Sequence, residues 1–349
     1  MRSAVLCLFA ASCGFGGVES LTIGTATAAA GQKATGYIKV AAGVDAGVNI
    51  PVIVVRGTKP GPTLALVAGS HGTEYASILA LEQLAQAADP ATLTGTLIIL
   101  PLVNPGSFEE KTPHINPVDK KNMNRFYPGK ADGTQTERVS WAISKQVIER
   151  CDHLIDLHGG DLDESLRKYS YWARTGTRVQ DEESRAMVLA FGLDHIILQD
   201  FRPSAANASG AVTITRFASA LGIPCVTAEA GHAGVSSAED IDALTQGIWS
   251  VMRYLKMLPG APLKVEHPIW IGRITVLNSD ADGAFYPLAN PEAYVSQGAK
   301  LGYVTDHFGA KIWDARAPVA GVIVYICSVP SMKKGNTVAY IGEIVAAPE

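Results

Sequence analysis

This sequence of 349 residues has little cysteine and no large excess of either positive or negative charge. Only three of its five cysteines lie beyond residue 20, namely Cys151, Cys225 and Cys327. They are widely spaced, and each lies in or beside an apolar run. This indicates small core residues, not a disulfide framework or a cysteine-based metal site. The net charge of −4, without any Lys/Arg cluster, gives no support to nucleic-acid binding.

Long hydrophobic runs are also lacking, because no stretch beyond the N-terminus approaches the roughly 20 apolar residues that span a bilayer. Residues 1–20 have the features of a signal peptide: Arg2, an apolar segment over 4–11 and a small-x-small cleavage site at 18–20. Residues 10–13 faintly resemble a lipoprotein box without its usual Leu. We therefore expect the protein to be exported, either to a periplasm or out of the cell. If the N-terminal segment is not cleaved, we expect the protein to be cytoplasmic.

The remaining composition is that of an ordinary globular protein, with 47% hydrophobic and 18% charged residues. Apolar runs and helical periodicity alternate along residues 21–258. This alternation predicts an α/β domain with a parallel or mixed sheet and helices on both faces. After a Pro/Gly-rich linker at 259–262, residues 263–349 show only short β runs. They predict a small all-β domain, sandwich- or barrel-like.

Local patterns place the individual elements. Strands are predicted at 50–55, 64–68, 96–103, 153–157, 169–173, 195–198 and 224–228, and helices at 75–88, 136–150, 182–191 and 211–221. A last helix is predicted to begin at a capping box of Ser236 and Glu239. Residues 106–133 form a long polar loop in this scheme, which is uncommon unless the loop is functional.

His71 and Glu74 lie in the string Gly69-Ser-His-Gly-Thr-Glu74, on a tight turn between a strand and a helix. Their spacing lets an imidazole nitrogen and a carboxylate oxygen meet at one cation, and the glycines allow the sharp bend. Such a pair suits Zn²⁺, which takes about three protein ligands in catalytic sites. The pair alone is weak evidence, because most His-x-x-Glu strings are surface pairs.

His158 supplies a third donor, because it also follows a predicted strand and precedes two glycines. Ligands of α/β sheets gather at the carboxyl ends of the strands, so these donors are expected to share one site. Asp156 is a candidate for orienting a ligand imidazole through its other nitrogen. A hydrogen bond between the backbone and the Asp156 carboxylate, with the carboxylate as acceptor, is the alternative.

Glu229 is the leading candidate for a general base, because it ends the apolar run 223–228 and a carboxylate there is expensive to bury without a role. His232 is its rival. In the polar loop, Asn124 and Arg125 could clamp a carboxylate, the arginine through a two-pronged contact. A solvated loop arginine is the alternative.

Four motifs then occur in a fixed order: Gly69-Ser-His-Gly-Thr-Glu74, Asn122-x-Asn-Arg-x-x-Pro-Gly129, Asp156-Leu-His158 and Glu229. In this order they resemble the succinylglutamate desuccinylase/aspartoacylase family, relatives of the zinc carboxypeptidases. The resemblance covers nearly the whole chain from Leu21, including the β tail. It implies a zinc-carboxypeptidase-like mixed sheet flanked by helices, with a C-terminal all-β domain.

The resemblance also implies roles. His71, Glu74 and His158 would bind one zinc ion per chain, and Glu229 would be general base and then general acid. Asn124 and Arg125 would hold a substrate carboxylate. Where family members often carry an arginine in an Arg-x-x-Pro-x-Asp context, this sequence has His114. Either His114 replaces that arginine in polarising the carbonyl or another group does, which leaves the substrate open.

The implied reaction is hydrolysis of the amide bond of an N-acyl amino acid or a similar small amide bearing a carboxylate. A zinc carboxypeptidase acting on short peptides is the alternative among enzymes. A carrier function of the tail at Lys311 is rejected, because Ala310 stands where carrier domains have an acidic residue. A non-catalytic binding protein is the alternative from another class. The sequence predicts no oligomeric state.

Overall fold

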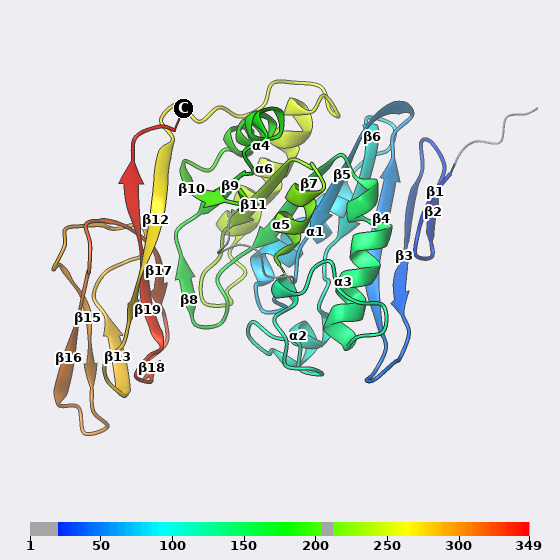
Figure 1. Ribbon diagram of the computed structural model, residues 1–349. Coiled ribbons are helices and arrows are strands. Elements are labelled where there is room, and N and C mark those ends of the chain that lie inside the picture. The colour runs from blue at the N-terminus through cyan, green and yellow to red at the C-terminus, as the bar shows by residue number, and fades with distance from the viewer. Residues whose placement is uncertain (1–19, 204–211, 349) are drawn as a thin grey trace, which may run out of the picture.

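The computed structural model describes residues 20–203 and 212–348 (Figure 1). All of the predicted signal peptide except Ser20 lies outside the described residues, so export stays a prediction. Within the described part of the chain, no helix combines the length and apolar character needed to cross a membrane.

The first half of the chain alternates strands with helices, as predicted. Its elements are β1 (Leu21–Ile23), β2 (Ala26–Ala28), β3 (Lys33–Val40), β4 (Val48–Arg56), β5 (Lys59–Val67), α1 (Tyr75–Ala87), β6 (Thr94–Leu100), α2 (Pro105–Glu110), α3 (Gln135–Gln146), β7 (His153–His158) and the 3-10 helices η1 (Met123–Arg125) and η2 (Ile148–Arg150). The second half continues with β8 (Glu164–Leu166), β9 (Tyr169–Arg174), α4 (Arg178–Phe191), β10 (His195–Asp200), α5 (Ile214–Ala220), β11 (Cys225–Glu229) and α6 (Ala238–Tyr254).

Most of the strands join one large mixed sheet, which confirms the predicted fold class of a mixed sheet with helices, while β1 and β2, among the described strands, pair only with each other. The large sheet begins with four strands from the end of the chain, β14 (Tyr294–Val295), β17 (Gly321–Cys327), β19 (Thr337–Val345) and β12 (Ile269–Asn278). The full order is β14-β17-β19-β12-β10-β9-β11-β7-β5-β6-β4-β3, and β8 pairs with β17. The central pairs β6–β5, β5–β7 and β7–β11 are parallel. The carboxyl ends of these strands therefore meet at one edge, where the chain delivers the predicted site residues.

Each face of the sheet has its own core, because successive side chains of a strand point to opposite faces. On β5, Leu64 and Leu66 pack in a core with α1, α4 and α6, whereas Ala65 and Val67 pack in a core with α3 and α5. Both faces are thus covered by helices (Figure 1). Such two-sided burial fixes the positions of the strand ends.

The tail after the linker consists of strands only, among the described residues. They are β12 (Ile269–Asn278), β13 (Gly283–Pro287), β14 (Tyr294–Val295), β15 (Lys300–Thr305), β16 (Lys311–Arg316), β17 (Gly321–Cys327), β18 (Ser331–Met332) and β19 (Thr337–Val345). β12 pairs in parallel with β10, so the large sheet runs into the tail. The strands β13, β15, β16 and β18 form a second sheet. The predicted boundary between the two domains stays a prediction.

Two local predictions were wrong. The segment 106–133 is not loop throughout, because α2 begins at Pro105 and η1 lies within it. The Asn104 side chain accepts a hydrogen bond from the Ser107 N–H and caps α2. The last helix is capped by Ser237, whose side chain accepts from the Asp240 N–H, so the predicted capping box was off by one residue.

Candidate active site

Three predicted metal-binding side chains converge at the strand ends. His71 and Glu74 lie in the turn between β5 and α1, and His158 is the last residue of β7. Nδ1 of His71 lies 2.6 Å from Oε1 of Glu74, and Nδ1 of His158 lies 2.9 Å from Oε2 of the same carboxylate. One donor atom from each residue lies within 4.8 Å of the other two. These three atoms could hold a metal ion.

The outward nitrogen of each imidazole has its own partner. Nε2 of His158 lies 3.1 Å from Oδ2 of Asp156, as the sequence predicted for an orienting carboxylate. Nε2 of His71 lies 3.1 Å from Oδ1 of Asn122. An acceptor at Nε2 keeps the proton there and leaves Nδ1 free to bind a metal. The donor set therefore fits a metal by tautomer as well as by position.

The charges of the three side chains suit a cation. The side chains are almost enclosed: His71 is 12% exposed, Glu74 is 4% exposed and His158 is 5% exposed. Burial opposes ionisation of Glu74, but His71 and His158 lower its pKa to about 2. Burial also opposes protonation of His158, but Asp156 and Glu74 raise its pKa well above the usual value. The carboxylates of Glu74 and Asp156 therefore stabilise positive charge at this place, either as protons on the imidazoles or as a metal ion.

The turn that carries His71 needs its two glycines for different reasons. Gly69 has φ of +69°, a conformation that glycine adopts readily. Gly72 does not bend in this way. A Cβ on Gly72 would lie 2.1 Å from the Phe108 backbone nitrogen, so the residue is small because α2 packs directly against it. The expectation that both glycines allow the bend is therefore met by Gly69 alone.

Glu229 lies beside the donor group. It ends β11 and is the register partner of His158 on β7. Burial raises its pKa well above the usual value, and Glu74 and Glu164 raise it further, while His158 opposes the shift. A carboxyl group that binds a proton readily next to a metal site suits a general base. The rival His232 is exposed, and its Nδ1 lies 2.5 Å from Oγ of Ser165.

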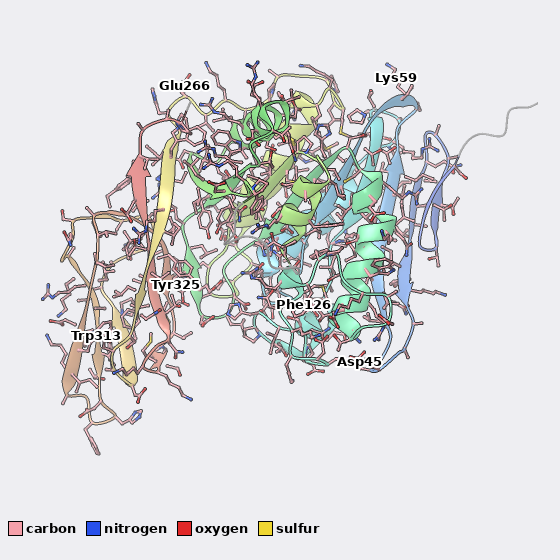
Figure 2. All side chains as sticks on the ribbon, in the orientation of Figure 1. Asp45, Lys59, Phe126, Glu266, Trp313 and Tyr325 are labelled. Carbon is pink, nitrogen blue, oxygen red and sulfur yellow. The ribbon has the colours of Figure 1, made fainter. Side chains whose placement is uncertain are left out.

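A cavity of about 520 Å³ opens at this edge of the sheet. One side, the strand-end wall, consists of residues from the large sheet and its loops: His71, Glu74, Asn122, Asn124, His158 and Glu229. The other side, the tail wall, comes from β17 to β19: Tyr325, Cys327, Ser331, Met332, Asn336 and Tyr340. Figure 2 shows Tyr325 where the tail meets the main body, with Trp313 farther out on the tail.

The predicted carboxylate clamp has one exposed member and one buried member. Arg125 is exposed and lines the cavity, with its Nη1 2.7 Å from the Asn124 carbonyl oxygen. The Asn124 amide is buried. Its Nδ2 lies 2.9 Å from Nε2 of His158, and its Oδ1 accepts from the Ile214 N–H at 2.9 Å. When Nε2 of His158 carries its proton, Nδ2 of Asn124 donates instead to Oδ2 of Asp156, 3.5 Å away. The contact of Asn124 with a substrate stays a prediction.

His114 lies close to the donor group, with its ring centroid 5.8 Å from that of His71. Its backbone has φ of +60° and is held by a hydrogen bond from its N–H to Asp161 at 2.9 Å. A hydrogen bond to Asp163 raises the pKa of His114 to about 9, against the effect of burial, and Asp161 adds to the shift. A positive charge therefore lies where the missing arginine was expected.

Sequence analysis missed the role of Asp161 as a junction. Its buried carboxylate accepts hydrogen bonds from the Thr73 hydroxyl and from the N–H groups of His114 and Leu162. It thereby joins three loops of the site. Its place directly after the string His158-Gly-Gly was a usable signal.

Comparisons with known proteins agree with this geometry. Residues 60–255, more than half of the chain, match the family described as succinylglutamate desuccinylase/aspartoacylase catalytic domain. An N-α-acetyl-L-2,4-diaminobutyric acid deacetylase of Halomonas elongata is 27% identical over 309 residues, covering 85% of this chain and 86% of the relative.

Solved structures share the fold. A succinylglutamate desuccinylase of a Silicibacter species superposes with a TM-score of 0.80 at 23% identity, covering 90% of this chain and 95% of that chain. The ectoine utilization protein EutE (DoeB) of Ruegeria pomeroyi, in a product-bound structure, gives a TM-score of 0.79 at 25% identity. That match covers 89% of this chain and 95% of the other.

Proposed function

Since this chain belongs to the succinylglutamate desuccinylase/aspartoacylase family, we propose that it is a zinc-dependent deacylase that hydrolyses the amide bond of an N-acyl amino acid. The observation that carries the proposal is the enclosed group of His71, Glu74 and His158 directly beside Glu229. The Halomonas relative, a deacetylase of an N-acetylated amino acid, supports this substrate class.

His71, Glu74 and His158 would hold one zinc ion per chain. Two imidazoles and a carboxylate are a donor set that catalytic zinc sites use, and the tautomers held by Asn122 and Asp156 fit it. When bound, zinc would polarise the substrate carbonyl and lower the pKa of a water molecule.

The protein's own groups would then move the proton and hold the substrate. Glu229 accepts a proton from the attacking water and donates it to the amine nitrogen as the C–N bond breaks. Its raised pKa suits the second step. Arg125 binds the substrate carboxylate, because its guanidinium is exposed in the cavity. The positive charge of His114 stabilises negative charge that develops on the carbonyl oxygen.

We further propose that the catalytic region is of the zinc-carboxypeptidase type. A small substrate fits the cavity of about 520 Å³ better than a long peptide, because residues of the tail line it together with the strand ends. Hydrolysis of short peptides is the competing function within the same chemistry. It would require that a peptide passes the tail wall.

The experiment compares the zinc-loaded protein on N-acyl amino acids and on short peptides, before and after chelation and after zinc is restored. We expect hydrolysis of one or more N-acyl amino acids that chelation abolishes and zinc restores. Turnover of peptides alone would contradict the deacylase function. Turnover that persists after complete removal of metal would contradict the role of zinc.

A further inference from the structure

Glu164, the first residue of β8, has no role in the proposed reaction although it lines the cavity. Its Oε2 accepts a hydrogen bond from the Asp161 N–H at 3.2 Å. Among the described residues, no lysine, arginine or histidine forms an ion pair with this carboxylate. A carboxyl group thus faces the cavity without a direct ion pair to the described part of the protein.

Among the side chains described around Glu164, acidic ones outnumber basic ones. Asp161 and Asp163 lie close by, and His114 is the cation that faces these three carboxylates. Burial raises the pKa of Glu164 to about 7, with His114 opposing the shift and Glu74 adding to it. A ligand that brings a positive charge to this place would stabilise the ionised carboxylate.

Aromatic rings lie beside the same carboxylate. β8 pairs with β17 so that Glu164 lies opposite Cys327, and Tyr325, two residues before Cys327 on β17, also lines the cavity. The rings of Tyr325 and Tyr340 are 4.8 Å apart. Burial raises the pKa of both hydroxyls, and the negative charge of Glu164 adds to the shift. Aromatic faces next to a carboxylate are a common binding arrangement for ammonium groups.

We propose that Glu164, together with Tyr325 and Tyr340, selects substrates whose amino-acid part carries a positively charged side-chain amine. This inference rests on the proposed deacylase function and names its substrate class. Arg125 offers a cation to the substrate carboxylate, and Glu164 offers a separate anion to the amine. The same arrangement disfavours substrates with a second carboxylate, such as N-acylated aspartate or glutamate, because two negative groups would meet.

The first test compares substrates of matched shape. The values of kcat/KM are measured for the N-α-acetyl derivatives of 2,4-diaminobutyrate and ornithine and for those of norvaline and norleucine, which lack the charge. We expect the zinc-loaded protein to prefer the amine-bearing substrates by roughly tenfold to hundredfold. Glu164→Gln should remove this preference, whereas Glu164→Asp, which keeps the charge, should retain part of it.

Glu266→Gln is the matched control, because Glu266 is exposed, lies just after the linker and is far from Tyr325 of the cavity (Figure 2). It should keep the full preference for amines. Equal kcat/KM for charged and neutral substrates in the unaltered protein would overturn the inference and leave the deacylase function standing. So would a Glu164→Gln variant that loses activity on all substrates equally, because Glu164 would then act in catalysis or structure.

The second test does not depend on hydrolysis. Calorimetry measures the binding of free 2,4-diaminobutyrate, ornithine and norvaline to the metal-free and zinc-loaded protein. We expect the diamino acids to bind more tightly than norvaline, with the difference lost in Glu164→Gln. If no N-acyl amino acid is hydrolysed but this difference is found, the deacylase function fails and the selectivity of Glu164 holds. Without any difference, the selectivity fails.

Discussion

The two walls of the cavity are built in different ways. In the strand-end wall, polar groups hold one another: Nδ1 and Nε2 of His158 have partners at 2.9 and 3.1 Å, and Nε2 of His71 has one at 3.1 Å. In the tail wall, the rings of Tyr325 and Tyr340 pack against each other, with their centroids 4.8 Å apart. Hydrogen bonds to an imidazole fix its orientation, whereas the side chains of the tail wall set the shape of the space that a ligand must fill. The strand-end wall therefore suits catalysis of the reaction, and the tail wall suits discrimination between substrates.

This difference has a measurable consequence. A substitution in the strand-end wall should lower the rate for all substrates alike. A substitution in the tail wall should change their ranking. The following predictions test this division in order of decreasing effect.

Glu229→Gln removes the proton acceptor of the strand-end wall while keeping its shape. We expect kcat to fall by about 100-fold to 10,000-fold for every substrate, with zinc content unchanged. Steady-state kinetics and metal analysis on the same sample check this, with Glu266→Gln as the charge-matched control. A variant with full activity would show that the assigned base is wrong.

Asn122→Ala removes the acceptor at Nε2 of His71. The imidazole would lose its fixed tautomer, so we expect zinc affinity to fall by about 10-fold to 100-fold. Competition with a chelator of known affinity measures the change. Asn49→Ala serves as the control, because Asn49 is exposed on β4. If both variants bind zinc equally well, the Asn122 contact has no part in holding the metal.

Tyr325→Leu changes the tail wall without touching the donor group. We expect the preference for amine-bearing substrates to fall by about 2-fold to 10-fold, while kcat/KM for neutral substrates changes less. Tyr286→Leu is the control, since Tyr286 is 45% exposed and stacks on Tyr303 in the second sheet. An equal loss on all substrates would remove the distinction between the walls.

Glu137→Gln tests the anchor of the loop that carries Asn122. The Glu137 carboxylate accepts a hydrogen bond from the Thr134 N–H at the start of α3 and pairs with Lys121 at 3.0 Å. These contacts, the Thr134 hydrogen bond first, lower the pKa of Glu137 from 4.5 to about 2. At pH 7 we expect the variant to lose about 1 kcal/mol of unfolding free energy.

The pH dependence follows from the lowered pKa. The stability contributed by ionised Glu137 is full above the unfolded pKa of 4.5 and is lost as pH falls toward 2. The difference in unfolding free energy between the variant and the original protein, measured by urea titration, should therefore shrink as the pH falls over this range. Glu149→Gln removes an exposed ion pair with Lys145 and should lower the unfolding free energy by less than Glu137→Gln does. A difference that is constant down to pH 2 would contradict the assigned pKa.

The sequence allowed the strand-end wall to be predicted well, because its signals are local. His71, His158 and Glu229 each follow an apolar run that became β5, β7 or β11, and neighbouring parallel strands bring their ends together. The start of α2 could also have been identified, since Asn104 followed by proline is a typical helix start.

The tail wall could not be predicted in the same way. Its position depends on the pairing of β12 with β10 and of β17 with β8, which joins segments far apart in the chain. No local pattern selects a strand's partner, because pairing depends on tertiary packing. The support of Asn124 by the Ile214 N–H has the same origin, since 90 residues separate the two.

The central claim is that His71, Glu74 and His158 hold one zinc ion. Calorimetric titration of zinc into the metal-free protein tests it most directly, with His158→Ala beside the original chain and Glu266→Gln as control. We predict one zinc site per chain in the original protein and the control, and an affinity at least about 100-fold weaker in His158→Ala. Unchanged zinc binding by His158→Ala would contradict the account.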